Sequence, residues 1–348
     1  MADTLHDIIW SDLCVSKDPR HGWFKATPDS MVASPVPAAM FEEAIEFYRL
    51  LESTWRTRGI DASRYGFPID WPPEHGTRLR VKRIGLANGE HVFICRAFRF
   101  KPKSFEELRM VPSLAKRLLS PEIKSGIGLF LGRPGAGKTT TACAYIRERA
   151  RRLGGVTWTS EGPVEIDIAG RHENGYIHQC EIDSPEQMAE SIRDLARATP
   201  NVLFVGEVLD DQTAEVVAQA AKMGFLVLCT YHGADLINGI ERFARAAGRG
   251  DVSPQFVEAF RFAVHLDLRL ATPSAPASTR LSQDSLIGSL PTGNPPRSLS
   301  VRALFLPNEV DAGRGHMKRG EFSMLGSEVD RQKGELLKEL SEMNLSKR

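Results

Sequence analysis

One short segment, Gly132–Thr139, constrains the fold more than any other part of this 348-residue chain. It reads Gly-Arg-Pro-Gly-Ala-Gly-Lys-Thr and matches the pattern G-x-x-x-x-G-K-[ST] in full. Glycines in this pattern let the backbone wrap closely around phosphate groups, with successive N–H groups pointing inward. The pattern requires a strand before it and a helix after it, and Gly126–Leu131 and Thr139–Arg152 supply both. The segment therefore predicts a nucleotide-binding loop.

The residues of this loop can be matched to parts of a nucleotide. Lys138 places a positive charge on the β- and γ-phosphates, and Thr139 offers its hydroxyl to Mg²⁺. The positive end of the helix that follows strengthens the field at the phosphates. We therefore expect ATP and Mg²⁺ as cofactors. The residues expected to bind them are Gly132, Pro134, Gly135, Ala136, Gly137, Lys138, Thr139 and Thr140.

Strands and helices alternate from Gly126 to about Leu270, which is typical of a parallel sheet covered on both faces. After the loop, we expect a strand at Val156–Thr159 and a helix at Ser184–Ala198. The following elements are an apolar strand at Asn201–Val205, a helix at Asp211–Met223 and a strand at Phe225–Thr230. This order predicts a RecA-like P-loop NTPase domain.

Polar side chains follow three of these strands, at the edge where ligands bind in open α/β sheets. Glu207 ends the apolar strand Asn201–Val205, as the acid of a Walker B segment does, and could hold Mg²⁺ through water. Glu161 and His232 follow two other strands. Taken singly, a glutamate after a strand is as often a surface or capping residue, and a lone histidine is more often structural. Together with the upstream loop, all three become candidate site residues.

The flanking regions differ in character from this central domain. Residues 1–101 are expected to form an N-terminal α/β domain, with a helix at Pro35–Arg56 and strands at Arg78–Ile84 and His91–Phe100. The ATPase domain is placed at residues 104–270. Residues 271–299 are rich in Ser, Pro, Thr and Gly and are expected to be a flexible loop, and residues 300–348 to be a strand followed by a helix.

Charge and cysteine usage narrow the class of protein. With 45 Lys and Arg against 44 Asp and Glu, the net charge is +1, so no overall field attracts nucleic acid or anionic lipid. The five cysteines are widely spaced and form no C-x-x-C pair, which disfavours a disulfide framework and a zinc site. The opening residues lack the basic and apolar regions of a signal peptide. We therefore expect a cytoplasmic protein.

Four segments together resemble the four boxes of the type II/IV secretion "traffic" ATPases, a superfamily that includes PilT-like pilus retraction motors. These segments are Gly132–Thr139, Glu161–Glu165, Val205–Glu207 and Thr230–His232. Ile177–Glu181 resembles the family's I-N-Q-R-E stretch, and Ser191–Arg197 resembles its paired-arginine helix. The resemblance covers roughly Arg78 to Leu270. It implies a RecA-like ATPase domain with a mainly parallel sheet, preceded by a smaller α/β domain of the PAS-like type.

The resemblance also implies roles for individual residues. Glu161 would activate or position the attacking water, Glu207 would serve Mg²⁺ and the water, and His232 would sense the γ-phosphate. Four arginines would bind or sense the nucleotide: Arg193 and Arg197 on the helix before the Walker B strand, and Arg96 and Arg99 reaching a neighbour's site from the N-terminal domain. A solvated charge at a strand end or on a helix surface is the competing interpretation for each arginine.

The assembly and location follow from the same resemblance. We expect a homo-hexamer on the inner face of the cytoplasmic membrane, with inner-membrane components of a secretion or pilus apparatus as partners and no direct binding of nucleic acid. Three departures from the family pattern favour a divergent branch, such as the conjugation or Dot/Icm-type ATPases. Gly162 stands where the family usually has Asp, Gly233-Ala234 replaces the usual Thr-Asn, and Ala271–Ser298 interrupts the expected C-terminal helical region.

Three functions remain open at this stage. The first is a hexameric motor that hydrolyses ATP to drive substrate transfer or pilus dynamics. The second is an ATP-gated assembly protein with negligible hydrolysis, because Gly162 leaves the acidic cluster with one carboxylate fewer. The third is a RecA-type nucleic-acid motor, which the balanced charge and the lack of a basic stretch interleaved with aromatic residues disfavour.

Overall fold

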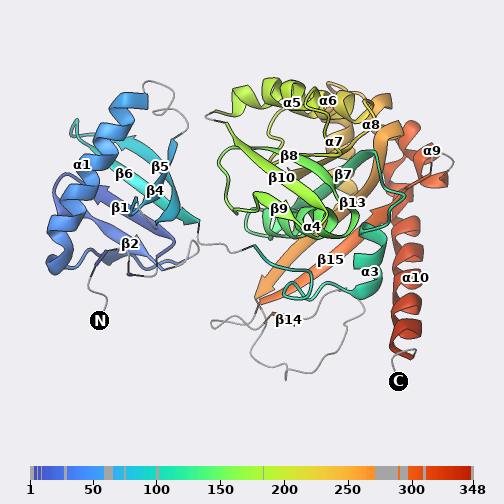
Figure 1. Cartoon of the computed structure of the whole chain (residues 1–348), viewed down its shortest axis with the longest axis horizontal. Helices are drawn as coiled ribbons and strands as arrows, with labels where there is room; N and C mark the ends of the chain where they lie inside the picture. Colours follow the sequence, from blue (N-terminus) through green and yellow to red (C-terminus); the bar gives the residue numbers. More distant parts are fainter. Residues whose placement is uncertain are drawn as a thin grey trace. The chain divides into compact units, whose positions relative to one another are not determined.

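The computed structural model divides the chain into two compact units (Figure 1). One unit comprises residues 1–101 and 182–185, and the other comprises residues 102–181 and 186–348. The structure describes residues 4–5, 7–8, 10–26, 30–58, 66–73, 76–98, 102–182, 184–270, 289–290, 297–308 and 311–345. Each unit has its own hydrophobic core and is described by itself.

The first unit is an antiparallel six-stranded sheet with the order β3-β2-β1-β6-β5-β4. Helix α1 (Phe41–Arg58) packs on it through side chains at helical spacing, with Ala44, Phe47 and Leu51 buried. The strands are β1 Asp12–Ser16, β2 Trp23–Lys25, β3 Ser34–Pro35, β4 Phe67–Trp71, β5 Thr77–Gly85 and β6 His91–Phe98, and the 3₁₀ turns are η1 Pro19–His21 and η2 Ala38–Met40.

Helix α1 begins later than the apolar pattern predicts. The expected helix starts at Pro35, whereas in the structure Pro35 ends β3 and Pro37 precedes the 3₁₀ turn η2. A residue before proline is held in an extended conformation, so Val36 cannot be helical ahead of Pro37. The helix therefore starts only at Phe41.

The second unit is built on a nine-stranded sheet with the order β14-β15-β13-β7-β12-β11-β8-β10-β9. The central strands from β13 to β10 are parallel, and antiparallel pairs lie at both edges. The strands are β7 Gly126–Gly132, β8 Gly155–Glu161, β9 Gly170–His172, β10 Gly175–Glu181, β11 Val202–Val205, β12 Leu226–His232, β13 Phe260–Leu270, β14 Ser289–Leu290 and β15 Arg297–Phe305.

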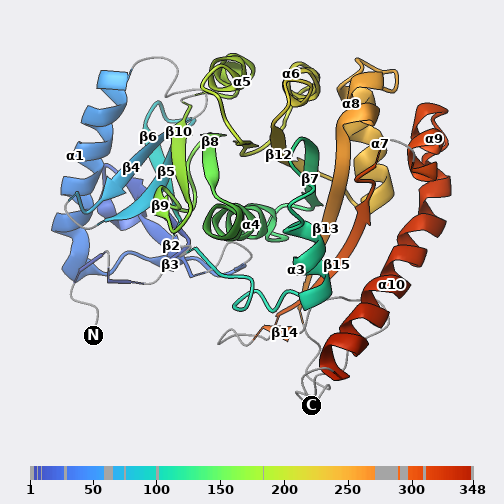
Figure 2. The same ribbon diagram turned by 45° about the vertical axis from the view of Figure 1, so that its right-hand side comes forward.

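Helices cover both faces of this sheet, as a central parallel sheet requires (Figure 2). Helices α3, α4 and α10 share one hydrophobic core with the strands, and α5 to α8 pack among themselves and on β7, β8 and β11 to β13. The helices are α3 Pro112–Leu118, α4 Lys138–Leu153, α5 Met188–Ala196, α6 Asp211–Ala221, α7 Leu236–Ala246, α8 Pro254–Ala259, α9 Ala312–Lys318 and α10 Leu325–Leu345, with 3₁₀ turns η3 Pro185–Gln187 and η4 Phe322–Met324.

The segment predicted as a flexible loop, residues 271–299, lies mainly outside the described residues. Where the structure does describe it, the backbone is in strands. Strand β15 begins at Arg297, three residues earlier than the expected strand at Ser300, because residues 297–299 pair with Leu268–Leu270 of β13. The pair Ser289–Leu290 forms β14 at the edge of the same sheet.

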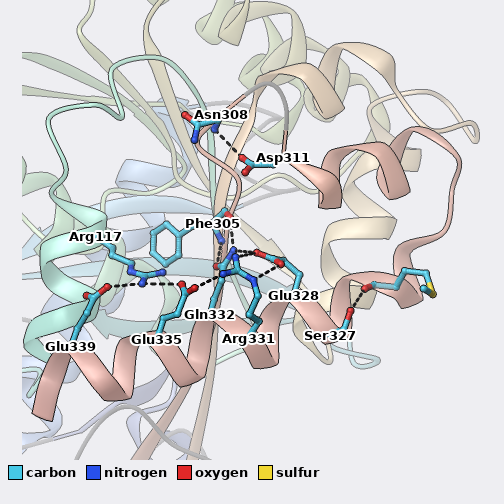
Figure 3. A network of polar contacts seen from close by, with 11 residues as sticks. Arg117, Phe305, Asn308, Asp311, Ser327, Glu328, Arg331, Gln332, Glu335 and Glu339 are labelled. Carbon is cyan, nitrogen blue, oxygen red and sulfur yellow. Dashed lines mark hydrogen bonds and ion pairs between the residues drawn. The ribbon is translucent and has the colours of Figure 1, made fainter.

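The C-terminal helix α10 is fixed to the sheet by polar contacts as well as by its apolar face (Figure 3). The Gln332 amide donates to the backbone carbonyl of Phe305 at 2.7 Å and accepts from the backbone N–H of Phe305 at 2.8 Å. Arg117 of α3 pairs with Glu339 at 2.6 Å and with Glu335 at 3.3 Å. Since an unpaired buried backbone group is costly, the Gln332 amide in effect completes the hydrogen bonding of β15. Across the described parts of the chain, no helix combines the length and apolar character needed to cross a membrane.

Candidate nucleotide site

The phosphate-loop segment connects the end of β7 to the start of α4, and its glycines adopt backbone conformations that other residues avoid. Gly135 and Gly137 have φ angles of +75° and +89°. A Cβ atom added at either would meet nothing within 4 Å, so both glycines border open space. Gly132 is confined instead, because an added Cβ would lie 2.6 Å from the carbonyl oxygen of Leu266. The loop thus has the backbone of a phosphate cradle, with Gly135 and Gly137 facing open space.

Lys138 lies at the first position of α4 and is only 7% exposed. Its Nζ atom donates to the carbonyl oxygen of Arg133 at 3.2 Å, so the side chain folds back over the loop. Burial lowers the pKa of Lys138, and the nearby carboxylates of Glu207 and Glu165 act against that shift. Thr139 and Thr140 follow on the first turn of α4 and are half-buried.

The parallel register brings the three strand-end candidates to the same edge of the sheet as this loop. His232 on β12 is paired with Gly132 on β7, the first glycine of the loop. Strand β11 lies next to β12 and is followed by Glu207, and β8 lies next to β11 and ends at Glu161. The sheet order therefore places Glu161, Glu207 and His232 in sequence beside the phosphate loop.

Only one oxygen of the buried Glu161 carboxylate accepts hydrogen bonds. Glu161 is 1% exposed, and its Oε1 atom accepts from the Thr159 hydroxyl at 2.6 Å and from the Gln179 amide at 2.8 Å. Its Oε2 atom is buried and has no hydrogen-bond partner. Burial raises the pKa of Glu161 to about 7. A carboxylate with one free oxygen and a pKa near neutrality has the properties of a general base.

Glu207 and His232 form a pair that is open to solvent. Their side chains are 40% and 38% exposed, and His232 Nε2 lies 3.1 Å from Glu207 Oε1. The turn before Glu207 is fixed by the Thr230 hydroxyl, which donates to the carbonyl oxygen of Gly206 at 2.6 Å. Gly206 in turn lies close against Glu161, because an added Cβ would be 3.2 Å from the Glu161 Cα. A larger residue at position 206 would press on the Cα and Cγ atoms of Glu161.

The two arginines of α5 are found in a different surface feature. Arg193 and Arg197 are exposed and line a shallow depression of about 390 Å³ between α5 and α6. Arg197 Nη1 lies 3.5 Å from Asp194. None of the phosphate-loop residues and none of the three strand-end residues lines this depression. The second unit by itself therefore does not group these arginines with the loop.

The N-terminal arginines belong to the first unit. Arg96 on β6 pairs with Asp12 of β1, with its Nε atom 2.8 Å from Asp12 Oδ1, and Asp12 is buried. This contact gives Arg96 a structural partner within its own sheet. Arg99 lies outside the described residues.

Two residues in contact with Glu161 have no role in the interpretation of the sequence, namely Thr159 and Gln179. Gln179 is in the I-H-Q-C-E stretch that resembles a family motif. Its contact with Glu161 depends on the parallel pairing of β10 with β8, which sets Gln179 opposite Thr159. The signal that could have found Gln179 is the alternation of Ile177, Gln179 and Glu181, which puts two polar side chains on one face of a strand.

A model of the family described as "Type II/IV secretion system protein" matches residues 69–252, which is more than half of the chain. The chain belongs to this family.

Curated relatives match about half of the chain. The type II secretion system protein HxcR of Pseudomonas aeruginosa is 30% identical over 185 residues, which is 51% of this chain and 35% of that protein. The type IV pilus assembly ATPase TfpB of Acinetobacter baylyi is 32% identical over 176 residues, which is 49% of this chain and 29% of that protein. The chain thus matches about a third of the length of these relatives.

Solved structures of secretion-family ATPases match nearly the whole chain. The pilus retraction motor PilT, solved with bound ADP, has a TM-score of 0.67 at 19% identity and covers 92% of this chain and 86% of its own. The Legionella pneumophila ATPase DotB has a TM-score of 0.63 at 18% identity and covers 97% and 88%. The predicted fold is confirmed: a mainly parallel α/β sheet preceded by a smaller N-terminal domain.

The chain's residues fit the magnesium nucleotide expected of a secretion-family ATPase. Among the described residues, no group of three or more His, Cys, Asp or Glu side chains could hold a metal ion by itself. Mg²⁺ in phosphate-loop sites takes few protein ligands, since phosphates and waters supply the others. Thr139 and Glu207 are the residues that would hold it, and the open space at Gly135 and Gly137 would admit the phosphates.

Proposed function

We propose that this secretion-family protein is a motor that hydrolyses ATP as a ring of six subunits. The observation that carries the proposal is the sheet register, which puts Glu161, Glu207 and His232 on consecutive strands beside the loop of Lys138. Such an edge combines a phosphate cradle, a base and polar groups for charge stabilisation, which are the parts that phosphoryl transfer requires.

In the proposed reaction, water attacks the γ-phosphorus of ATP and the bond to the β–γ bridging oxygen breaks, leaving ADP. Mg²⁺ would neutralise charge on the phosphate oxygens. Glu161 takes the proton of the water on its free Oε2 atom, which has no other partner. Lys138 stabilises the charge that develops on the β- and γ-phosphates. His232 and Glu207 orient one another at the open side of the site.

In the proposed ring, the four candidate arginines lie where subunits meet. We place Arg193 and Arg197 at a subunit boundary because both are exposed, and assign Arg96 and Arg99 to the nucleotide site of a neighbouring subunit. Relatives that match about half of the chain are named as a type II secretion system protein and a type IV pilus assembly ATPase. The proposed setting is accordingly the cytoplasmic face of the inner membrane, where ATP turnover would drive substrate transfer, conjugation or pilus dynamics.

Two measurements on the purified chain test this function. Glu207→Gln should keep binding of a fluorescent ADP analogue within about threefold of the wild type while ATP turnover falls at least about tenfold. Glu122→Gln, an exposed glutamate just before β7, is the matched control and should leave both unchanged. Light scattering with ATP should give a mass near six subunits of 38.6 kDa. A protein that stays monomeric and has the same turnover in Glu207→Gln as in the wild type would contradict the proposal.

One observation favours a second function, an ATP-gated binding protein with negligible hydrolysis. Gly162 follows Glu161 directly and supplies no carboxylate at the end of β8. With fewer acids around the water, binding could proceed without turnover. Gly162→Asp distinguishes the two functions, because a large rise in turnover indicates a weakened enzyme. Tight ATP binding without turnover in both proteins would favour the binding protein.

A further inference from the structure

The environment of Glu161 distinguishes its two oxygens. Oε1 accepts two hydrogen bonds, from Thr159 Oγ1 at 2.6 Å and from Gln179 Nε2 at 2.8 Å. Oε2 accepts none and is buried. A proton that reaches this carboxyl group therefore goes to Oε2, because Oε1 is already occupied by donors.

The orientation of the Gln179 amide is fixed by the backbone around it. Its Oε1 atom accepts from the N–H of Ile168 at 2.7 Å, and its Nε2 atom also donates to the carbonyl oxygen of Ile166 at 3.1 Å. A flipped amide would set its oxygen against the Ile166 carbonyl and its NH₂ group against the Ile168 N–H. The backbone thus holds the NH₂ group of Gln179 toward Glu161.

Strand β10 places this amide by its parallel pairing with β8. Gln179 is opposite Thr159, and Glu181 is opposite Glu161. Glu181 accepts from the backbone N–H of Val164 at 2.9 Å, so β10 holds the segment after Glu161 at two points. That segment includes Glu165, whose charge acts on Lys138.

We propose that Gln179 is a positioning residue for Glu161, which it anchors through Oε1 so that Oε2 is the oxygen left to take the proton of the attacking water. The inference rests on the proposed ATPase function. Gln179 does not touch the nucleotide in this scheme. It acts by fixing which carboxylate oxygen takes the proton, and by stabilising the charged form of Glu161 as a hydrogen-bond donor.

The charged groups around Glu161 determine how its pKa changes when the Gln179 hydrogen-bond donor is removed. Glu165 on the following segment and Glu181 on β10 both raise the pKa of Glu161, as burial does, and the thiols of Cys143 on α4 and Cys180 on β10 also sense its charge. The hydrogen bonds from Thr159 and Gln179 lower the pKa of Glu161. Removal of the Gln179 donor therefore moves the pKa of Glu161 further above 7.

The test compares Gln179→Ala with Gln179→Glu, which keeps an acceptor for Ile168 but replaces the donor by a like charge. Tyr176→Ala, on the opposite face of β10, is the control. The first readout is carbon-13 NMR of the glutamate side-chain carboxyls in the nucleotide-free protein, with the Glu161 signal assigned by its loss in Glu161→Gln. We expect its midpoint to rise by about 0.5–1 unit in Gln179→Ala and by more in Gln179→Glu.

The second readout is the dependence of turnover on pH. At pH 7 we expect kcat to fall about two- to fivefold in Gln179→Ala with KM for ATP within about twofold, and the deficit to shrink as pH rises. A merely structural role would lower kcat equally at all pH values. If Gln179→Ala does not fold, Thr159→Val removes the other donor to the same oxygen and serves in its place.

An unchanged Glu161 midpoint in both folded Gln179 variants overturns the inference. The NMR readout needs no ATP, so it separates this inference from the proposed function. A wild-type protein without turnover overturns the proposed function, and with it the catalytic meaning of Gln179, whereas the titration still decides whether Gln179 fixes the carboxylate.

Discussion

His232 Nε2 and Glu207 Oε1 lie 3.1 Å apart across the neighbouring strands β12 and β11. Both side chains are more than a third exposed, and an ion pair of this kind contributes little to stability. The pair is set beside the phosphate loop by the pairing of His232 with Gly132. Its position supports the proposed role in the reaction of bound nucleotide.

This pair leads to the first prediction. His232→Gln should change the free energy of unfolding by less than about 1 kcal/mol. ATP turnover should fall at least about tenfold with nucleotide binding retained. The control is His316→Gln, because His316 forms a similar pair with Glu321, at 2.9 Å, on a different part of the surface. Equal turnover in both variants would show that His232 has no part in the reaction.

The buried carboxyl of Glu161 should make stability depend on pH. Its pKa is raised from 4.5 to about 7, so the folded state favours the protonated form, and the stability present below pH 4.5 is lost as pH rises through 7. Glu161→Gln mimics the protonated acid. It should therefore be more stable than the wild type by up to roughly 3 kcal/mol above pH 7 and equal to it below about pH 4.5.

Chemical denaturation at pH 4.5 and pH 8 measures this difference. Glu173→Gln, an exposed glutamate, serves as the control and should follow the wild type at both pH values. Glu161→Gln should lose turnover while it gains stability. A variant that is less stable than the wild type at pH 8 would mean that Glu161 is charged and paired in the folded protein.

Two glycines of the phosphate loop should respond differently to alanine. Gly132→Ala puts a Cβ atom 2.6 Å from the Leu266 carbonyl oxygen and should lower stability by about 2–3 kcal/mol. Gly135→Ala meets no atom within 4 Å and should cost only about 1 kcal/mol, from its φ of +75°. It should weaken ADP binding about tenfold, because the methyl group enters the phosphate cradle. Thermal melts and ADP titrations of both variants separate the two effects, and equal melts would contradict the steric argument.

Arg314 should be the most sensitive arginine of the second unit for folding. It is 2% exposed, and its guanidinium donates to several backbone carbonyls, which belong to Val257, Glu258, Phe260, Leu306 and Asn308. Arg314→Met removes all of these hydrogen bonds, although the carbonyls of Glu258 and Phe260 still accept from Arg261. The substitution should cost about 3–5 kcal/mol. Arg319→Met, on the exposed end of the same region, should stay within about 0.5 kcal/mol. A small effect at Arg314 would mean that water replaces the guanidinium.

Local patterns were sufficient to predict much of the ATPase fold. The strand before the phosphate loop, the helix after it and the apolar strands β11 and β12 are visible as short runs of defined period. Their bounds differ from the expected ones by only a few residues. The parallel order of β7, β12, β11 and β8 follows from the fold class, and so does the common edge of Glu161, Glu207 and His232.

The features of the fold and the site that the sequence did not predict depend on contacts between segments that are distant in sequence. The contact of Gln179 with Glu161 exists only because β10 pairs with β8. Arg314 likewise donates to the carbonyl oxygen of Glu258, which is 56 residues earlier in the chain. The ion pair of Arg96 could not be predicted from the sequence for the same reason. A sequence pattern gives Arg96 as a charge on a strand, whereas its buried partner Asp12 is 84 residues away. No local propensity contains such information.

The central claim is that the Lys138 loop binds ATP for hydrolysis, and ATP turnover of Lys138→Ala tests it most directly. Lys124→Ala, an exposed lysine just before β7, is the matched control. We predict Mg²⁺-dependent turnover in the wild type and in Lys124→Ala within about twofold of each other, and a loss of at least about 100-fold in Lys138→Ala. Turnover retained in folded Lys138→Ala would contradict the account.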